Sequence, residues 1–254
     1  MLIKLSLVYI LNHIKQMLEM KFNTYSNFPQ EIHENFVKTY ILPYRDKFEE
    51  CIDLGCGAGG LIRELLKYRQ CHIVGADISD LSINRCLENP AFKKEGVEFL
   101  LNGMMDLDKP NFKNRFDLIM SYSVLHIVPG DTPAKFKLLK HIAKPSAIIA
   151  IDSIPRITWN KIFFFLIRNT FKLGIGGTAI RWIGPIVLPH RSKDYIKELS
   201  HLDYMKDFSS SNFIDLSYFK SKEFRDSFKL LRLDIVPQDT FFTARRLRFV
   251  VKKL

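Results

Sequence analysis

The run Cys51-Ile-Asp-Leu-Gly-Cys-Gly-Ala-Gly59 is followed, after one helical stretch, by Val74-Gly-Ala-Asp77. The first run begins as an apolar strand and ends in three alternating glycines, which allow a tight turn and the close approach of a ligand. The helix expected from Leu61 onward offers that ligand free backbone N–H groups and a positive dipole end. A strand, a glycine loop and a helix in this order are typical of a nucleotide-binding α/β fold.

Two acids flank this loop. Asp53 stands directly before Leu-Gly, where a carboxylate is a poor neighbour for a phosphate and a good neighbour for an ammonium group. Asp77 closes the second strand, where its two oxygens can accept hydrogen bonds from both hydroxyls of a ribose. The loop with a leading and a trailing acid therefore predicts a ligand that carries both an ammonium group and a ribose.

The pattern continues outward from the loop as short apolar runs that alternate with helical spacing. Strands are predicted at 51–54, 72–76, 97–101, 116–121 and 147–151, with helices at 61–69, 81–88 and 133–142. Such alternation predicts a parallel sheet with helices on both faces. Toward the C-terminus a helix is predicted at 224–231, followed by strands at 231–236 and 247–252 that form a hairpin at one edge of the sheet.

The chain resembles the class I S-adenosylmethionine-dependent methyltransferases over about residues 48–152. The matching positions are Asp53, Gly55, Gly57, Gly59, Asp77, Asn102-Gly103, Phe116-Asp-Leu-Ile-Met-Ser121 and Val124-Leu-His-Ile127. The resemblance implies a Rossmann-like, seven-stranded, mostly parallel sheet whose last strand is antiparallel. It also implies S-adenosylmethionine as the cofactor.

The resemblance assigns cofactor roles by position. Asp53 and the loop Gly55-Cys56-Gly57 would hold the methionine end, Asp77 the ribose and Ile78 the adenine, with Ser121 beneath the methyl-bearing sulfur. The family often has an aspartate after the glycine that follows the third strand, and here that position is Met104. Either Asp106 substitutes for it, or the backbone of Met104 and Met105 reads the adenine.

Candidates for the catalytic chemistry follow the fourth and fifth strands. Methyl transfer requires an aligned acceptor and exclusion of water, and an oxygen acceptor benefits from a base. His126 is the first candidate base, with a helix-capping or half-buried histidine as the alternative. Tyr122 is expected to line the pocket. Asp152 would either orient the acceptor or be an ordinary acid at a strand end.

The remaining segments divide the chain into a helical N-terminal part at 1–47 and a methyltransferase domain at 48–254. An apolar insertion at about 153–222 is expected to form a helical cap over the site, with an amphipathic membrane-contacting surface as the alternative. The N-terminal apolar stretch, 2–19, is too short to span a bilayer and is read as a helix that packs on the domain or lies on a membrane.

Charge and cysteine content bound the partners and the compartment. The chain carries a net charge of +11, which favours an anionic partner such as a phosphorylated metabolite, a nucleic acid or a membrane surface. Its four cysteines form no C-x-x-C pair, so no metal site is expected, and they fit a reducing compartment. We therefore expect a cytoplasmic protein, in part peripheral to the inner face of a membrane.

A finer resemblance concerns methyltransferases from surface-polysaccharide clusters. It rests on short matches at Ile151-Asp-Ser-Ile-Pro155, at the Lys161-Ile-Phe-Phe run, at Pro237-Gln-Asp239 and at the Arg246-Leu-Arg-Phe-Val-Val ending. It implies a small-molecule acceptor, a sugar oxygen on a phosphorylated or lipid-linked glycan. The alternatives are an RNA methyltransferase, which the charge favours although no RNA-binding domain is appended, and a cofactor-binding protein without catalysis.

Overall fold

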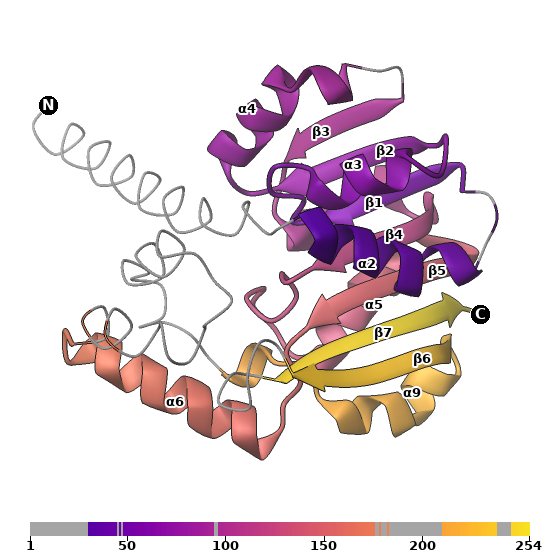
Figure 1. Ribbon diagram of the computed structural model, residues 1–254. Helices are drawn as coiled ribbons and strands as arrows, with labels where there is room; N and C mark the ends of the chain where they lie inside the picture. The colour runs from indigo at the N-terminus through magenta and orange to yellow at the C-terminus, as the bar shows by residue number, and fades with distance from the viewer. Residues whose placement is uncertain are drawn as a thin grey trace, which may run out of the picture.

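The computed structural model describes residues 30–44, 46, 48–93, 96–175, 178, 182, 210–237 and 245–254. Seven strands form one sheet in the order β3-β2-β1-β4-β5-β7-β6 (Figure 1). The strands are β1 Glu50–Leu54, β2 His72–Asp77, β3 Val97–Leu101, β4 Phe116–Tyr122, β5 Ala143–Ser153, β6 Phe228–Pro237 and β7 Arg245–Lys253. The helix expected at 2–19 and most of the segment 176–209 lie outside the described residues.

Strands β1 to β5 run parallel to one another, whereas β7 is antiparallel to both β5 and β6. This arrangement confirms the predicted α/β class, the antiparallel last strand and the hairpin at the edge of the sheet. The α-helices among the described residues are α2 Gln30–Tyr40, which precedes β1, and α3 Gly60–Leu66, α4 Asp80–Glu88, α5 Thr132–Ile142, α6 Thr158–Lys172 and α9 Lys222–Arg225. The 3-10 helices are η2 Leu42–Tyr44, η3 Pro90–Phe92, η4 Met104–Leu107, η5 Pro110–Phe112, η7 Ser210–Asn212 and η8 Leu216–Lys220.

The helix predicted at 224–231 is wrong. Helix α9 ends at Arg225, and β6 already begins at Phe228, where it pairs with Lys253 of β7. Phe228-Lys-Leu-Leu-Arg-Leu is compatible with either periodicity, so its pairing partner decides its conformation. Because β7 presents a full row of backbone groups, strand pairing prevails over the local helical spacing.

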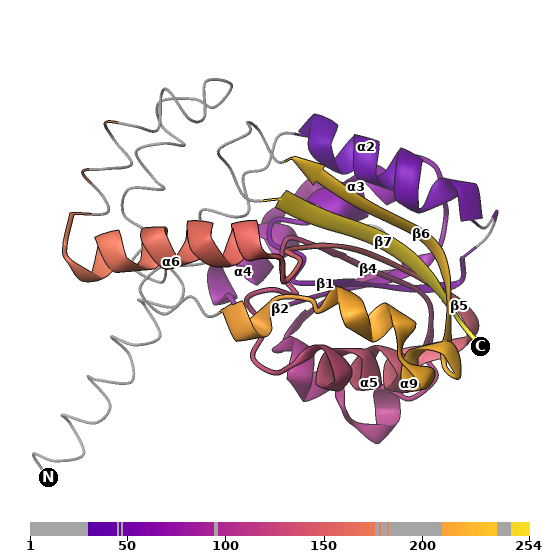
Figure 2. The ribbon, with the colours of Figure 1, turned by 90° about the horizontal axis from the view of Figure 1, so that it is seen from below.

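Helices cover both faces of the sheet, as Figure 2 shows. On one face, Phe136 of α5 stacks on Phe249 of β7 and packs edge-on against Phe224. On the other face, α2, α3 and α4 share a buried cluster with the strands, to which α2 contributes Phe36 and Val37. Helix α2 thus shares its core with the sheet, while the domain boundary near residue 47 stays a prediction.

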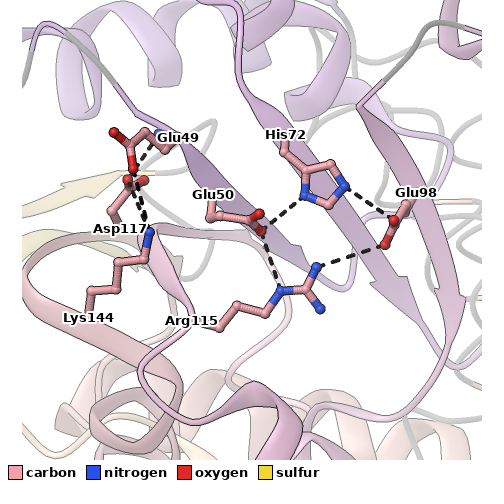
Figure 3. A network of polar contacts seen from close by, with 7 residues as sticks. All are labelled: Glu49, Glu50, His72, Glu98, Arg115, Asp117 and Lys144. Carbon is pink, nitrogen blue, oxygen red and sulfur yellow. Dashed lines mark hydrogen bonds and ion pairs between the residues drawn. The ribbon is translucent and has the colours of Figure 1, made fainter.

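Polar side chains gather at the amino ends of the strands (Figure 3). Glu50 Oε2 lies 3.0 Å from His72 Nδ1 and 3.3 Å from Arg115 Nε, and Glu98 approaches His72 Nε2 at 3.2 Å. Beside them, the backbone N–H of Glu49 donates to Asp117 at 2.9 Å. These contacts connect β1, β2, β3 and β4 at their amino ends. The carboxyl ends of the strands, on the opposite side, stay available for a ligand site.

No helix among the described residues combines the length and the apolar character needed to cross a membrane.

Candidate active site

A cleft opens at the carboxyl ends of β1, β2 and β4, where the topology of an open parallel sheet places ligands. Its floor is the glycine loop after β1 with the first residues of α3, and two acids stand at its base. Its far wall comes from the turn after β4 and from α2. The lining residues are Asp53, Gly55, Cys56, Gly57, Ala58, Gly60, Leu61, Asp77, Tyr122, Ser123, Val124, Ile127 and His33.

The glycine loop is fastened to β2 by its backbone. The N–H groups of Gly55 and Cys56 both donate to the carbonyl of Ala76, at 2.7 and 3.1 Å. Gly55 has φ +72°, and a Cβ built there would lie 2.3 Å from Cγ2 of Val124. Only glycine satisfies both conditions, so the loop can pass directly beneath the turn that follows β4.

Asp53 is buried at the base of the cleft. Its Oδ1 has no hydrogen-bond partner among the described residues, and burial, with the Asp77 charge second, raises the pKa of its carboxyl well above the usual value. A buried acceptor without a donor is costly unless a ligand satisfies it. The ammonium group predicted from the sequence would supply the missing donor, so the residue present fits the expected cofactor.

Asp77 joins the glycine loop to the start of α4. Its Oδ2 accepts from the N–H of Gly57 and its Oδ1 from the N–H of Ser79, both at 2.9 Å. Burial raises the pKa of this carboxyl, and the N–H donors of Gly57, Ser79 and Ile78 oppose the rise. Three donors leave one of the roughly four acceptor sites of the carboxylate open, so Asp77 can still accept a hydrogen bond from a ligand hydroxyl on the cleft side.

The wall opposite the glycine loop is the turn after β4. Tyr122 lines the cleft, which is the placement predicted for it, and Ile127 adds an apolar surface. Ser123 has φ +64°, a strained conformation for a residue with a side chain, and its N–H donates to the carbonyl of Asp152 at 3.0 Å. Strain of this kind is often found at functional sites, where the surrounding structure holds it in place.

His33 completes the cleft from α2, and the sequence analysis missed it. Its ring packs edge-on against Tyr122 with centroids 5.6 Å apart, and it lies over the start of α3 at Gly60. Burial, with Arg63 second, lowers the pKa of the imidazole to about 4, so it is neutral at physiological pH. In the sequence, His33 is a single histidine on the amphipathic stretch 30–40. Nothing in that stretch indicates that the histidine packs against Tyr122.

The two predicted catalytic residues do not line the cleft. His126 is buried, and burial, then Arg246 and Lys135, lowers its pKa well below the usual value. Asp152 pairs with Arg246, and its Oδ2 accepts from Arg248 Nε at 3.0 Å. Arg248 in turn donates to the Tyr122 hydroxyl at 3.3 Å, so the Asp152 carboxylate is connected to the cleft wall through Arg248. The catalytic roles of His126 and Asp152 stay predictions.

The other predicted cofactor residues do not line the cleft. The Ser121 hydroxyl is buried and donates to the carbonyl of Leu54 at 2.8 Å. Ile78 and Met105 are exposed, whereas Met104 is buried in the core below η4. Asp106 Oδ2 accepts from the N–H of Gly103, so this oxygen caps η4 locally. Their contacts with adenine and sulfur stay predictions.

Comparison with known proteins agrees with this geometry. A family model described as a methyltransferase domain matches residues 45–172. A phosphoethanolamine N-methyltransferase of Triticum aestivum is 31% identical over 109 residues, which are 42% of this chain and 21% of that protein. A sterol 24-C-methyltransferase of Aspergillus fumigatus is 26% identical over 104 residues, 39% of this chain and 26% of that protein. The matches thus span about a quarter or less of these relatives.

Solved structures share the fold at low sequence identity. An S-adenosylmethionine dependent methyltransferase candidate from Listeria monocytogenes superposes with a TM-score of 0.57 at 11% identity, covering 88% of this chain and 99% of that one. The [4+2]-cyclase SpnF superposes with a TM-score of 0.55 at 12% identity, covering 88% and 80%. The family model covers about half of the chain, and the sheet order and the glycine loop with its two acids agree with it. The chain therefore belongs to the methyltransferase-domain family, with the class I, S-adenosylmethionine-dependent fold that its motif resembles.

Proposed function

We propose that this protein transfers a methyl group from S-adenosylmethionine to an oxygen of a small acceptor, a sugar or a lipid-linked glycan. The observation that carries the proposal is the buried Asp53 carboxylate, whose Oδ1 lacks a partner beside a glycine loop and a second acid, Asp77. This combination matches the ammonium and ribose ends of the cofactor. The wall of His33, Tyr122 and Ile127 is the side on which the acceptor would bind.

The residues of the cleft divide the work of binding. Asp53 would accept hydrogen bonds from the ammonium group, and Asp77 would accept them from the ribose hydroxyls. The thiol of Cys86 donates to the Gly57 carbonyl at 3.3 Å and so helps hold the loop in place. S-adenosylmethionine supplies a methyl group on a sulfonium sulfur, and the protein has to align the acceptor and exclude water.

His33 is the proposed contact for the acceptor hydroxyl. Its neutral imidazole, next to Tyr122, can accept a hydrogen bond from a hydroxyl. The oxygen becomes strongly acidic as it gains the methyl group, so an imidazole of lowered pKa can still take up the proton that the hydroxyl loses. His126 remains the alternative base from the sequence. The relatives whose names specify phosphoethanolamine and sterols support a small-molecule acceptor. The free cysteines support a reducing, cytoplasmic compartment.

Calorimetric titration with S-adenosylmethionine and S-adenosylhomocysteine is the first test. Micromolar binding of both is expected, and Asp77→Ala is expected to weaken it by about 1–3 kcal/mol, roughly 5- to 150-fold in Kd. Glu88→Ala removes a carboxylate from the exposed end of α4 and serves as the matched control. Absence of binding, or equal Kd values for Asp77→Ala and Glu88→Ala, would refute the cofactor assignment.

Transfer of a labelled methyl group to glycans and lipid-linked glycans is the second test. His33→Phe keeps the ring against Tyr122 and is expected to lower turnover about 100-fold while the cofactor Kd stays the same. His126→Ala, made in parallel, would show the same loss if His126 were the base instead. A product methylated at nitrogen or carbon would contradict the oxygen acceptor and leave methyl transfer itself standing.

A further inference from the structure

Helix α6 is apolar on two opposite faces. Its inner face buries Phe164 and Phe171 against the body of the protein, where the ring of Phe164 meets Phe213 edge-on at 5.2 Å. Its outer face presents Ile162, Phe165 and Leu166 to solvent, with exposed fractions of 49%, 55% and 57%. The solvent side of a helix in a globular protein is normally polar, and a contiguous apolar patch marks a contact surface.

Cations flank this outer face, and α6 contains no acidic residue. Lys161 and Lys172 are exposed beside the apolar side chains, and the guanidinium of Arg168 lies 5.7 Å from the centre of the Phe165 ring. Beyond the last turn, Leu173 is 74% exposed and extends the apolar stripe. Figures 1 and 2 both show α6 projecting past the layers of helices that cover the sheet. An apolar stripe bordered by lysine and arginine is the pattern of a helix that lies in a membrane interface.

We propose that the outer face of α6 (Ile162, Phe165 and Leu166, with Lys161, Arg168 and Lys172) docks on an anionic membrane surface. The apolar side chains would enter the boundary between headgroups and acyl chains, and the cations would meet lipid phosphates. A second copy of this chain would bring the same cations against each other, so charge complementarity favours anionic lipid as the occupant. The fifteen residues of α6 extend about 22 Å, less than the thickness of a bilayer core, so the helix lies in the plane of the interface.

Docking at α6 would place the cleft close to the membrane. Helix α6 follows β5 almost directly, and Ile127, which lines the cleft, packs against the same cluster as the inner face of α6. An acceptor held in the membrane by a lipid would then reach the far wall of the cleft without leaving the bilayer. This last consequence rests on the proposed function, whereas the docking itself does not.

The experiment is flotation of the full chain with vesicles of phosphatidylcholine, with and without an equal share of phosphatidylglycerol. The fluorescence of Trp159 and Trp182, the chain's two tryptophans, is recorded in parallel. Binding to the anionic vesicles is expected, together with a blue shift and weakening by salt. The double variant Phe165→Ser/Leu166→Ser is expected to lose about tenfold or more of its partitioning, whereas Leu87→Ser, at an exposed position on α4, keeps it.

The contribution of charge has its own matched pair of variants. Lys161→Glu/Lys172→Glu is expected to bind anionic vesicles at least about tenfold more weakly, since each lysine near the surface contributes about 1 kcal/mol. Lys137→Glu/Lys220→Glu changes the net charge equally at exposed positions elsewhere and should retain binding.

Three outcomes would overturn the proposal. They are no binding to anionic vesicles, equal binding by the α6 variants and their controls, and a dimer in light scattering that Phe165→Ser/Leu166→Ser dissociates while vesicles bind neither form. Calorimetry with S-adenosylmethionine on the same variants separates the two proposals. Cofactor binding without vesicle binding would refute docking alone, and vesicle binding without cofactor binding would refute only the proposed function.

Discussion

At the scale of single residues, the site depends on one carboxyl that the fold places unfavourably. Asp53 is the next-to-last residue of β1 and is buried with Asp77 nearby, and the pKa of its carboxyl is raised well above the usual value. A charge in such a place is normally paired or lost by protonation. An unsatisfied buried acid of this kind is expected where a cationic ligand completes the site. The bound ligand then supplies the hydrogen-bond donor and the positive charge that the cofactor-free protein lacks.

Asp53→Asn tests this reading by opposite effects on stability and on binding. The folded pKa of Asp53 lies above its unfolded value of about 3.9, so the folded chain holds the proton more tightly and its stability falls as pH rises through that window. The variant is therefore expected to raise the Tm of the cofactor-free protein at pH 7 to 8, with the gain vanishing near pH 4. It should also weaken S-adenosylmethionine binding about tenfold or more.

Thermal unfolding across pH and calorimetry in buffers of different ionisation enthalpy measure both effects. The wild type should release protons as the cofactor binds, and Asp53→Asn should show less release. A variant that is less stable at neutral pH, or one whose affinity is unchanged, would remove Asp53 from the role given to it.

At the scale of elements, α2 is the part that closes the cleft. It packs on α3 and on the sheet through Phe36 and Val37, and this packing carries His33 to the glycine loop. The contact with α3 is close, because a Cβ built on Gly60 would lie 2.4 Å from Cε1 of His33. The first residue of α3 and the ring from α2 thus determine each other's positions.

Gly60→Ala is expected to destabilise the protein by about 1–3 kcal/mol, since the added methyl group forces the His33 ring and α2 to move. His33→Ala in the same chain makes room for that methyl group. The double variant should then be more stable than the sum of the two single changes predicts, by about 1 kcal/mol or more. Urea unfolding of the four proteins gives the coupling free energy, and strictly additive effects would contradict the contact.

At the scale of the whole molecule, the network of polar contacts and the ligand cleft lie at opposite ends of the strands. The polar contacts of Figure 3 lie at the amino ends of the strands, and the cleft lies at their carboxyl ends. The length of each strand thus separates the polar contacts from the cleft. A substitution among the polar contacts at the amino ends should therefore alter the stability of the protein without altering the cofactor site.

Glu50→Gln tests that separation, because it removes the charge that faces both His72 and Arg115. These side chains are about a quarter to a third exposed, so the loss of stability should stay below about 1 kcal/mol and shrink in high salt. The Kd for S-adenosylmethionine should be unchanged. Glu98→Gln, at a more exposed carboxyl of the same network, should have a smaller effect. A severalfold change in Kd would show that the amino ends and the carboxyl ends of the strands are coupled.

Much of the fold was readable from sequence because its signals are local. The glycine loop and Asp77 belong to one strand–turn–helix–strand unit, in which Gly57 donates directly to Asp77. The N-cap of α4 is equally local, since the Ser79 hydroxyl accepts from the N–H of Ser82. The strand predicted at 97–101 coincides with β3. Contacts between residues close in sequence depend mainly on the residue types involved, and so the pattern alone was enough.

Features that depend on distant partners were decided only by the tertiary structure. Pairing with β7 made Phe228 the start of a strand, and packing of α2 brought His33 to Tyr122. Asp152 joined Arg246 and Arg248 because β5 and β7 lie side by side, although these residues are far apart in the chain. The sequence thus determined the cofactor loop and the order of elements. Burial and long-range pairing, which no local pattern encodes, decided which side chains face the cleft.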